Sequence, residues 1–199
     1  MLPRVTTVLN VISKGEGLLR WVANNGWKES QRIKFESADR GTTVHAIAAS
    51  ILRGETISVG ESLEGYVAGI EKAVVRFGLM DGKALIEQRL VNLTDGYCGT
   101  CDFVTDTWVG DWKTSGALHF ENDLQISAYL NALRDMQERG DRVAKKVKLP
   151  KKGVLIRLDG RGGFEYKISS EQDLSLDYGG FKNALGLFNL MKTKGMMNG

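Results

Sequence analysis

Three short segments rich in β-branched and aromatic residues constrain the fold of this chain most strongly. They are ALIEQRLVN (84–92), YCGTCDFVT (97–105) and TWVGDWKT (107–114). Only short polar stretches that contain Thr-Asp-Gly and Thr-Asp-Thr separate them, and such stretches are typical of turns. Connections this short join antiparallel neighbours. The three segments therefore predict an antiparallel meander.

Helical patterns surround these strands. A helix is expected from Thr42 or Thr43 to Gly54, because its apolar residues recur at i, i+3, i+4 and i+7. Further helices are expected over 14–24, 62–77, 121–140 and roughly 178–191, with a polar, basic connector that runs up to residue 39. GVLIRLD and GFEYKIS, on either side of residues 160–163, predict a hairpin. The order of elements indicates an α/β or α+β fold with a mixed central sheet and helices on its faces.

Length and composition indicate an ordinary globular protein. A chain of 199 residues suits one compact domain. No apolar run approaches the roughly 20 residues that a membrane span requires. The N-terminal stretch MLPRVTTVLNVIS lacks the long apolar region and the small-residue cleavage site of a signal peptide. We therefore expect a cytoplasmic protein without a membrane partner.

Two groups of basic residues say more about partners than the net charge of +3 does. Each group can form a solvated surface, or a surface that follows the phosphates of a nucleic acid. The first group is Lys28, Arg32, Lys34 and Arg40, and the second is Arg142, Lys145, Lys146, Lys148, Lys151 and Lys152.

The two cysteines, Cys98 and Cys101, form a C-x-x-C pair, which raises the question of a metal or redox site. A structural zinc site usually takes four nitrogen or sulfur ligands, and His45 and His119 are the only histidines. An iron–sulfur cluster needs about four thiolates, so none is expected. The pattern favours two small, partly buried side chains over a metal site.

Turn positions predict which acidic residues face one another in the meander. If the second turn is centred between residues 106 and 107, Asp102 lies opposite Asp111. Lys113 shares the face of Asp111, because side chains two apart in a strand point to the same side. If the first turn is centred near residues 94 and 95, Glu87 lies opposite Asp102 or one pair away. A register slip of one residue would reverse the face.

Two interpretations of this acidic cluster stay open. Neighbouring carboxylates repel one another, and a single lysine neutralises only one of them. The cluster is therefore either a solvated sheet face with an Asp111–Lys113 ion pair, or a site for a divalent cation. Carboxylate oxygens are the ligands that Mg²⁺ and Mn²⁺ prefer.

Taken together, four ordered motifs resemble the PD-(D/E)XK nuclease superfamily, specifically its RecB-like exonuclease branch. They are GTTVH (Gly41–His45), a glycine shortly before an aspartate (Gly99–Asp102), D-x-K (Asp111–Lys113) and QISAY (Gln125–Tyr129). Each motif is weak alone, but the ordered set at these intervals is specific. The opening PRVTTVL also resembles the start of this branch, whereas the region after residue 141 is assigned by extension.

The resemblance implies a restriction-endonuclease-like α/β core and one nuclease domain over residues 1–199. Residues 1–40 would be a helical and basic N-terminal segment, 41–140 the catalytic core, and 141–199 a C-terminal hairpin and helix. The implied protein is a cluster-free, phage-type or mitochondrial-type exonuclease that depends on Mg²⁺ or Mn²⁺. It would act on DNA ends or single strands in recombination, repair or replication, as a homo-oligomer or with a recombination partner protein. An endonuclease of the same superfamily and an inactive nucleic-acid-binding module are the alternatives.

The resemblance also implies roles for individual residues. Asp102 and Asp111 would hold the cation, and the backbone carbonyl of Trp112 would complete its ligands, with the indole in the core. Lys113 would position the attacking water and stabilise charge on the phosphoryl oxygens.

Three further residues have both a structural and a functional interpretation. His45 would be a metal ligand, although a lone helical histidine is more often a core residue. Glu87 is either a ligand through water or a structural charge at the edge of the site. Gln125 and Tyr129 share one helical face, and either pack against the sheet or hold the lysine, the carboxylates or a substrate phosphate.

Overall fold

The computed structural model describes residues 1–12 and 15–196. Its helices and strands follow one another in the order α1 (Val5–Leu9), α2 (Gly15–Asn25), α3 (Trp27–Leu52), α4 (Glu61–Phe77), β1 (Ala84–Asn92), β2 (Tyr97–Thr105), β3 (Trp108–Lys113), α5 (Phe120–Glu138), the 3₁₀ turn η1 (Ala144–Lys146), β4 (Lys152–Leu158), β5 (Phe164–Ser169) and α6 (Glu171–Thr193). The predicted strands and their order are confirmed.

The five strands form one mixed sheet in the order β1-β2-β3-β4-β5. The pairs β1–β2, β2–β3 and β4–β5 are antiparallel, whereas β3 and β4 are parallel. A parallel pair needs a crossover connection, and α5 supplies it. The predicted meander and the α/β fold with a mixed central sheet are therefore both confirmed.

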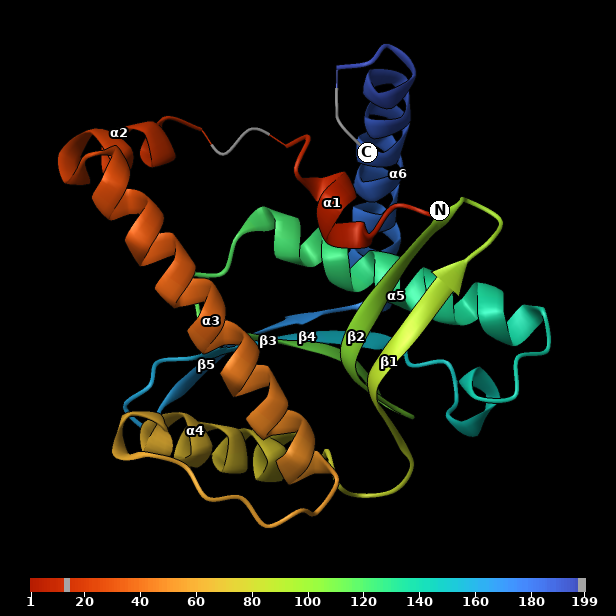
Figure 1. Ribbon diagram of the computed structural model, residues 1–199. Coiled ribbons are helices and arrows are strands. Elements are labelled where there is room, and N and C mark those ends of the chain that lie inside the picture. The colour runs from red at the N-terminus through yellow and green to blue at the C-terminus, as the bar shows by residue number, and fades with distance from the viewer. Residues whose placement is uncertain (13–14, 197–199) are drawn as a thin grey trace.

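Helices cover both faces of this sheet (Figure 1). On one face α1, α5 and α6 enclose a core that includes Tyr97, Leu133 and Phe181. On the other face α3 and α4 enclose a second core with Ile70 and Trp112. Burying apolar side chains on both faces stabilises the sheet.

The predicted connector up to residue 39 is wrong, because α3 is one continuous helix from Trp27 to Leu52. This stretch has no proline, and its exposed residues include strong helix formers. Arg32 also pairs with Glu29 at 2.6 Å and with Glu36 at 2.5 Å, spacings that support a helix. The helix thus crosses residues 40–41, where the sequence analysis put the start of the catalytic core.

Thr42 and Thr43 consequently lie inside α3 rather than at its N-cap, which corrects the predicted start. Their hydroxyls donate to the carbonyl oxygens of residues 38 and 39, both at 3.1 Å. The predicted end of this helix is confirmed, since Gly54 follows in a left-handed conformation with φ of 73°.

The C-terminal helix begins earlier than predicted, at Glu171 rather than near Tyr178. Ser170 and Asp173 form a reciprocal capping pair: Asp173 N–H donates to Ser170 Oγ at 3.2 Å, and Ser170 N–H donates to Asp173 Oδ2 at 2.8 Å. This cap satisfies the N–H groups of residues 170 and 173, so the helix begins seven residues before the predicted start near residue 178.

None of the helices in residues 1–12 and 15–196 combines the length and the apolar character that crossing a bilayer requires.

Candidate active site

The predicted register of the meander is confirmed around Asp102. The pairs on either side of it are Ile86↔Phe103 and Gln88↔Cys101 between β1 and β2, and Phe103↔Gly110 and Val104↔Val109 between β2 and β3. Asp102 and Asp111 take the next position, where β2 and β3 separate. There the N–H of Trp112 donates to Oδ2 of Asp102 at 2.7 Å. The Asp102 side chain thus accepts a backbone donor of β3 at the point where the ladder ends.

Asp102 also lies beside His45 of α3 and Glu87 of β1. One ligand atom from each of these three residues lies within 4.8 Å of the other two. His45 Nδ1 is 3.1 Å from Asp102 Oδ1. Glu87 has a φ of 50°, a left-handed conformation that is rare for a non-glycine residue, and it lies within β1 where the pairing with β2 skips one residue. The group has the composition of a divalent-cation site.

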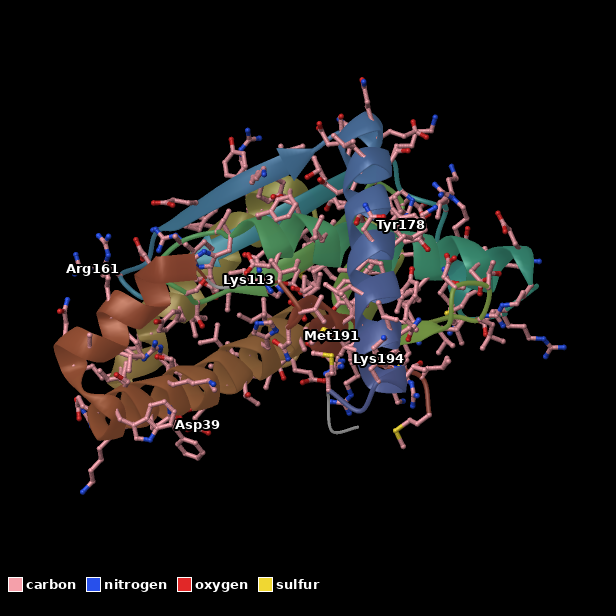
Figure 2. The ribbon with its side chains drawn as sticks, turned by 90° about the horizontal axis from the view of Figure 1, so that it is seen from above. Asp39, Lys113, Arg161, Tyr178, Met191 and Lys194 are labelled. Atoms are coloured by element: carbon pink, nitrogen blue, oxygen red, sulfur yellow. The ribbon has the colours of Figure 1, made fainter. Side chains whose placement is uncertain are left out.

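A second network holds Asp111, which is only 2 % exposed. Lys113 Nζ lies 2.5 Å from Asp111 Oδ2, an ion pair whose geometry is not that of a hydrogen bond. Gln125 of α5 bridges the pair, since its Nε2 donates to Asp111 Oδ1 at 3.1 Å and its Oε1 accepts from Lys113 Nζ at 2.9 Å. Gln125 Nε2 also donates to the Tyr129 hydroxyl at 2.8 Å. The D-x-K strand and the QISAY helix are therefore joined by direct contacts, near the middle of the molecule (Figure 2).

The electrostatics of the site show an excess of negative charge. Burial and the charge of Asp102 raise the pKa of Asp111, although Lys113 opposes the shift. Burial and the charge of Asp102 also raise the pKa of Glu87. Burial alone would lower the pKa of His45, but its contact with Asp102 raises that pKa to about 9. A bound cation would offset the repulsion between these carboxylates and so favour their ionised forms.

The side chain of Trp112 lies in the core, as the sequence predicted, whereas its backbone N–H contacts Asp102. The indole is 1 % exposed and lies 5.4 Å from the ring of Phe103 in the core beneath α3 and α4. In an extended strand the N–H and C=O of one residue point to the same side. Because the N–H of Trp112 points at Asp102, its carbonyl also faces β2.

A glycine in each of the motifs GTTVH (Gly41–His45) and Gly99–Asp102 lies close to residues around this network. A Cβ on Gly99 would lie 2.6 Å from Cε1 of Tyr129, so only glycine lets the tyrosine ring pack there. A Cβ on Gly41 would lie 3.4 Å from Thr114 Oγ1, which is ordinary contact. Gly99 is thus required by packing, whereas Gly41 marks where α3 passes the end of β3.

A cavity of about 1120 Å³ opens beside these residues. Its walls are α1 with the residues before it, one side of α3, and β1 with β2; His45, Glu87 and Tyr129 lie in its lining. Three arginines that belong to no predicted motif or basic group also line it: Arg4, Arg53 and Arg89. The position of Arg89 was predictable from sequence, because it lies two residues after Glu87 on the same strand. Arg53 follows His45 by eight residues at the end of α3, whereas Arg4 reaches the cavity only through the tertiary fold.

The two basic groups are not brought together. Lys28, Arg32, Lys34 and Arg40 are exposed along α3. Lys145, Lys146, Lys148, Lys151 and Lys152 are exposed on and after η1, at the turn end of the β2–β3 hairpin, where Lys148 N–H donates to Asp106 Oδ1 at 2.8 Å. Several of these charges already have partners, since Arg32 pairs with two glutamates and Lys151 lies 3.6 Å from Glu171.

Cys98 and Cys101 are both buried and unbonded to each other. The Cys101 thiol donates to the carbonyl oxygens of Phe103 at 3.4 Å and Gly110 at 3.5 Å. Burial raises the pKa of this thiol well above its ordinary value. These contacts fit the predicted role of small buried side chains.

No protein-family model matches the chain, and no curated protein matches its sequence. Among solved structures, the chain is similar to an alkaline exonuclease (LHK-Exo) from Laribacter hongkongensis. The match covers 96% of this chain and 93% of that chain, with 12% sequence identity and a TM-score of 0.34. At so low a TM-score, the function proposed below depends on the residues of the site.

Proposed function

We propose that this protein is a divalent-metal-dependent nuclease that hydrolyses phosphodiester bonds of DNA, as an exonuclease of the RecB-like PD-(D/E)XK type. The observation that carries the proposal is the meeting of two groups. His45, Glu87 and Asp102 have ligand atoms within 4.8 Å of one another, and Asp111 with Lys113 follows on the adjacent strand.

The residues present fit a hard divalent cation. They offer carboxylate oxygens, one imidazole and the carbonyl of Trp112, and the raised pKa values of Asp111 and Glu87 reflect charge that a cation would neutralise. We infer that His45, Asp102, Asp111 and the Trp112 carbonyl hold the ion, with Glu87 as a further ligand. Bound there, Mg²⁺ or Mn²⁺ would polarise a phosphoryl oxygen and lower the pKa of a nearby water.

Lys113 is the residue best suited to act on the reacting atoms. Its Nζ is held between Asp111 Oδ2 and Gln125 Oε1, so the ammonium has a defined position. It can donate to the attacking water and stabilise the negative charge that grows on the phosphoryl oxygens. The water oxygen would bond to phosphorus and lose a proton to the solvent, while the bond from phosphorus to the leaving oxygen breaks and that oxygen takes a proton from the solvent.

His45 and Gln125 would orient the groups beside them. In the metal-free protein the raised pKa of His45 favours the protonated ring, so a bound cation would displace one proton; Nδ1–H would then donate to Asp102 and Nε2 would ligate the ion, a common arrangement of histidine ligands. Gln125 positions both members of the Asp111–Lys113 pair, and Tyr129 supports Gln125 from below. Lys34 of α3, with the three arginines that line the cavity, would provide a surface for phosphates.

The test is a nuclease assay on linear and covalently closed circular DNA with Mg²⁺, Mn²⁺ or EDTA. Metal-dependent degradation of linear DNA alone supports the exonuclease, and cleavage of circles would instead indicate an endonuclease. Lys113→Ala should abolish hydrolysis, whereas Lys83→Ala, a change at an exposed lysine just before β1, should not. DNA binding without hydrolysis in either metal would contradict the proposal and favour an inactive binding module.

A further inference from the structure

One side of α3 continues far beyond the cavity. Thr42, His45 and Ala49 of this helix line the cavity near the sheet. The N-terminal part of α3, together with α2, projects away from the sheet as an arm (Figure 1). Helical geometry decides which residues of the arm share the side that contains His45.

Two exposed residues of the arm fall in line with His45. Trp27 lies 18 residues before His45, which is five full turns, so the two side chains project in the same direction about 27 Å apart along the axis. Lys34 lies 11 residues before His45, within about 20° of the same line and about 16 Å away. The indole of Trp27 is 71 % exposed, and Lys34 is exposed as well. We call this line of residues, from Trp27 through Lys34 to His45, the α3 track.

Acidic side chains of the arm lie elsewhere on the helix. Glu29 and Glu36 project from the side opposite to the track, where both pair with Arg32. Asp39 lies roughly 120° around the axis, and Figure 2 shows it at the outer edge of the molecule, away from Lys113. The track itself therefore carries a cation and an aromatic ring without a carboxylate before the catalytic group.

The lining of the cavity adds further cations. Arg4 before α1, Arg53 at the end of α3 and Arg89 on β1 line the cavity together with His45. Three arginines in the lining of one cavity suit a chain of phosphates, because arginine binds phosphate oxygens bidentately. Along α3, Lys34 comes before His45 and Arg53 after it, so cations lie on both sides of the His45–Glu87–Asp102 group.

We propose that the α3 track binds a single-stranded nucleic acid and leads it to the carboxylates. Trp27 stacks on an unpaired base, and Lys34 contacts a phosphate. A stacking ring selects single strands, because the bases of a duplex already stack on their neighbours. That the nucleic acid runs toward the carboxylates rests on the proposed function. Binding of the nucleic acid to the track does not depend on hydrolysis.

The test measures binding in EDTA, where cleavage plays no part. A fluorescein-labelled oligothymidylate and a duplex of equal length serve as probes, with fluorescence anisotropy as the signal. Trp27→Ala should weaken binding of the single strand about ten-fold, as expected for the loss of one stacked base. Lys34→Ala should weaken it about three-fold and lower the slope of log affinity against log salt by about one.

Two matched variants on another side of α3 decide whether the alignment matters. Phe35 is 77 % exposed, but it lies ten residues before His45 and so about 80° from the track. Lys28 lies about 100° from it. Phe35→Ala and Lys28→Ala should each change the affinity less than about two-fold, since neither base stacking nor a track phosphate is lost.

Several results would contradict the proposed role of the α3 track. Equal losses in the aligned and the non-aligned variants would indicate a diffuse basic surface, and no loss in any variant would exclude the arm from binding. Equal losses for duplex and single strand would exclude selection by stacking. Because all these measurements are made in EDTA, they are independent of the metal-dependent assay that tests the nuclease itself.

Discussion

Gly99 on β2 lies against the ring of Tyr129 on α5, so closely that a Cβ on Gly99 would approach Tyr129 Cε1 to 2.6 Å. The hydroxyl of the same tyrosine accepts from Gln125, which bridges Asp111 and Lys113. Because Gly99 has no Cβ, the Tyr129 ring can pack against β2, and Tyr129 in turn contacts Gln125, which accepts from the proposed catalytic Lys113.

Gly99→Ala should destabilise the protein by about 1–3 kcal/mol, because the added methyl overpacks a site that cannot relax freely. We expect nuclease activity to fall as Tyr129 and Gln125 shift. Urea unfolding and the linear-DNA assay measure the two effects. Gly41→Ala is the matched control, since its Cβ meets Thr114 at an ordinary 3.4 Å and a helical alanine is favoured by about 0.5–1 kcal/mol. Equal destabilisation by both changes would contradict this explanation.

Lys113→Met should abolish activity and also lower the stability of the metal-free protein. Its partner Asp111 is 2 % exposed, and removing one member of a buried pair costs about 3–5 kcal/mol. The double variant Asp111→Asn with Lys113→Met should recover much of that stability while staying inactive. Unfolding free energies of the three proteins in EDTA measure this. If the double variant were no more stable than the single one, the ion pair would not be the source of the loss.

Gln125→Leu should reduce kcat about 10–100-fold, as for other residues that orient groups around a metal site. The leucine occupies a similar volume but cannot accept from Lys113 or donate to Asp111. Because the contact acts on the position of Lys113 rather than on substrate binding, KM should change little. A rise in KM with unchanged kcat would assign Gln125 to substrate binding instead.

Mn²⁺ should stabilise the protein against unfolding in the absence of DNA, by about 2.7 kcal/mol at a concentration of 100 times its Kd. Asp102→Asn and His45→Ala should each reduce this effect, since both residues belong to the His45–Glu87–Asp102 group. His119→Asn provides the control at the other histidine, because asparagine keeps an N-cap acceptor at the start of α5. Thermal unfolding with and without EDTA gives the comparison, and loss of the Mn²⁺ effect in His119→Asn would contradict the assignment.

Asp135 should make stability depend on acid pH at a place away from the site. Burial opposes its ionisation, but hydrogen bonds from Thr94, the Leu93 N–H and Arg139 lower its pKa below the ordinary 3.8. A carboxyl group with a lowered pKa in the folded state stabilises above its unfolded pKa, and that contribution is lost as the pH falls through the folded pKa. Asp135→Asn should therefore cost about 1–3 kcal/mol at pH 7, and this cost should shrink as the pH falls below 3.8, which urea unfolding at a series of pH values measures.

The local part of this site was predictable from sequence. The turns between the strands determine the register, so Asp102, Asp111 and Glu87 could be placed near one another by counting residues. The D-x-K triplet places the acid and the amine on one side of a strand, and QISAY places Gln125 and Tyr129 about one helical turn apart. These relationships depend only on the period of a strand or a helix.

Contacts between distant segments were decided by the tertiary structure alone. The contact between Gly99 and Tyr129 and the cavity lined by Arg4, Arg53 and Arg89 both join residues from separate elements. His45 was expected beside Asp102 only through the family resemblance, because no local pattern relates these two residues. The sequence did not predict the full length of α3, because its polar N-terminal part lacks the apolar stripe by which a helix is recognised. Ion pairs between Arg32 and two glutamates support that part of the helix instead. Local periodicity determines which side chains share a face, whereas packing between elements decides which faces meet.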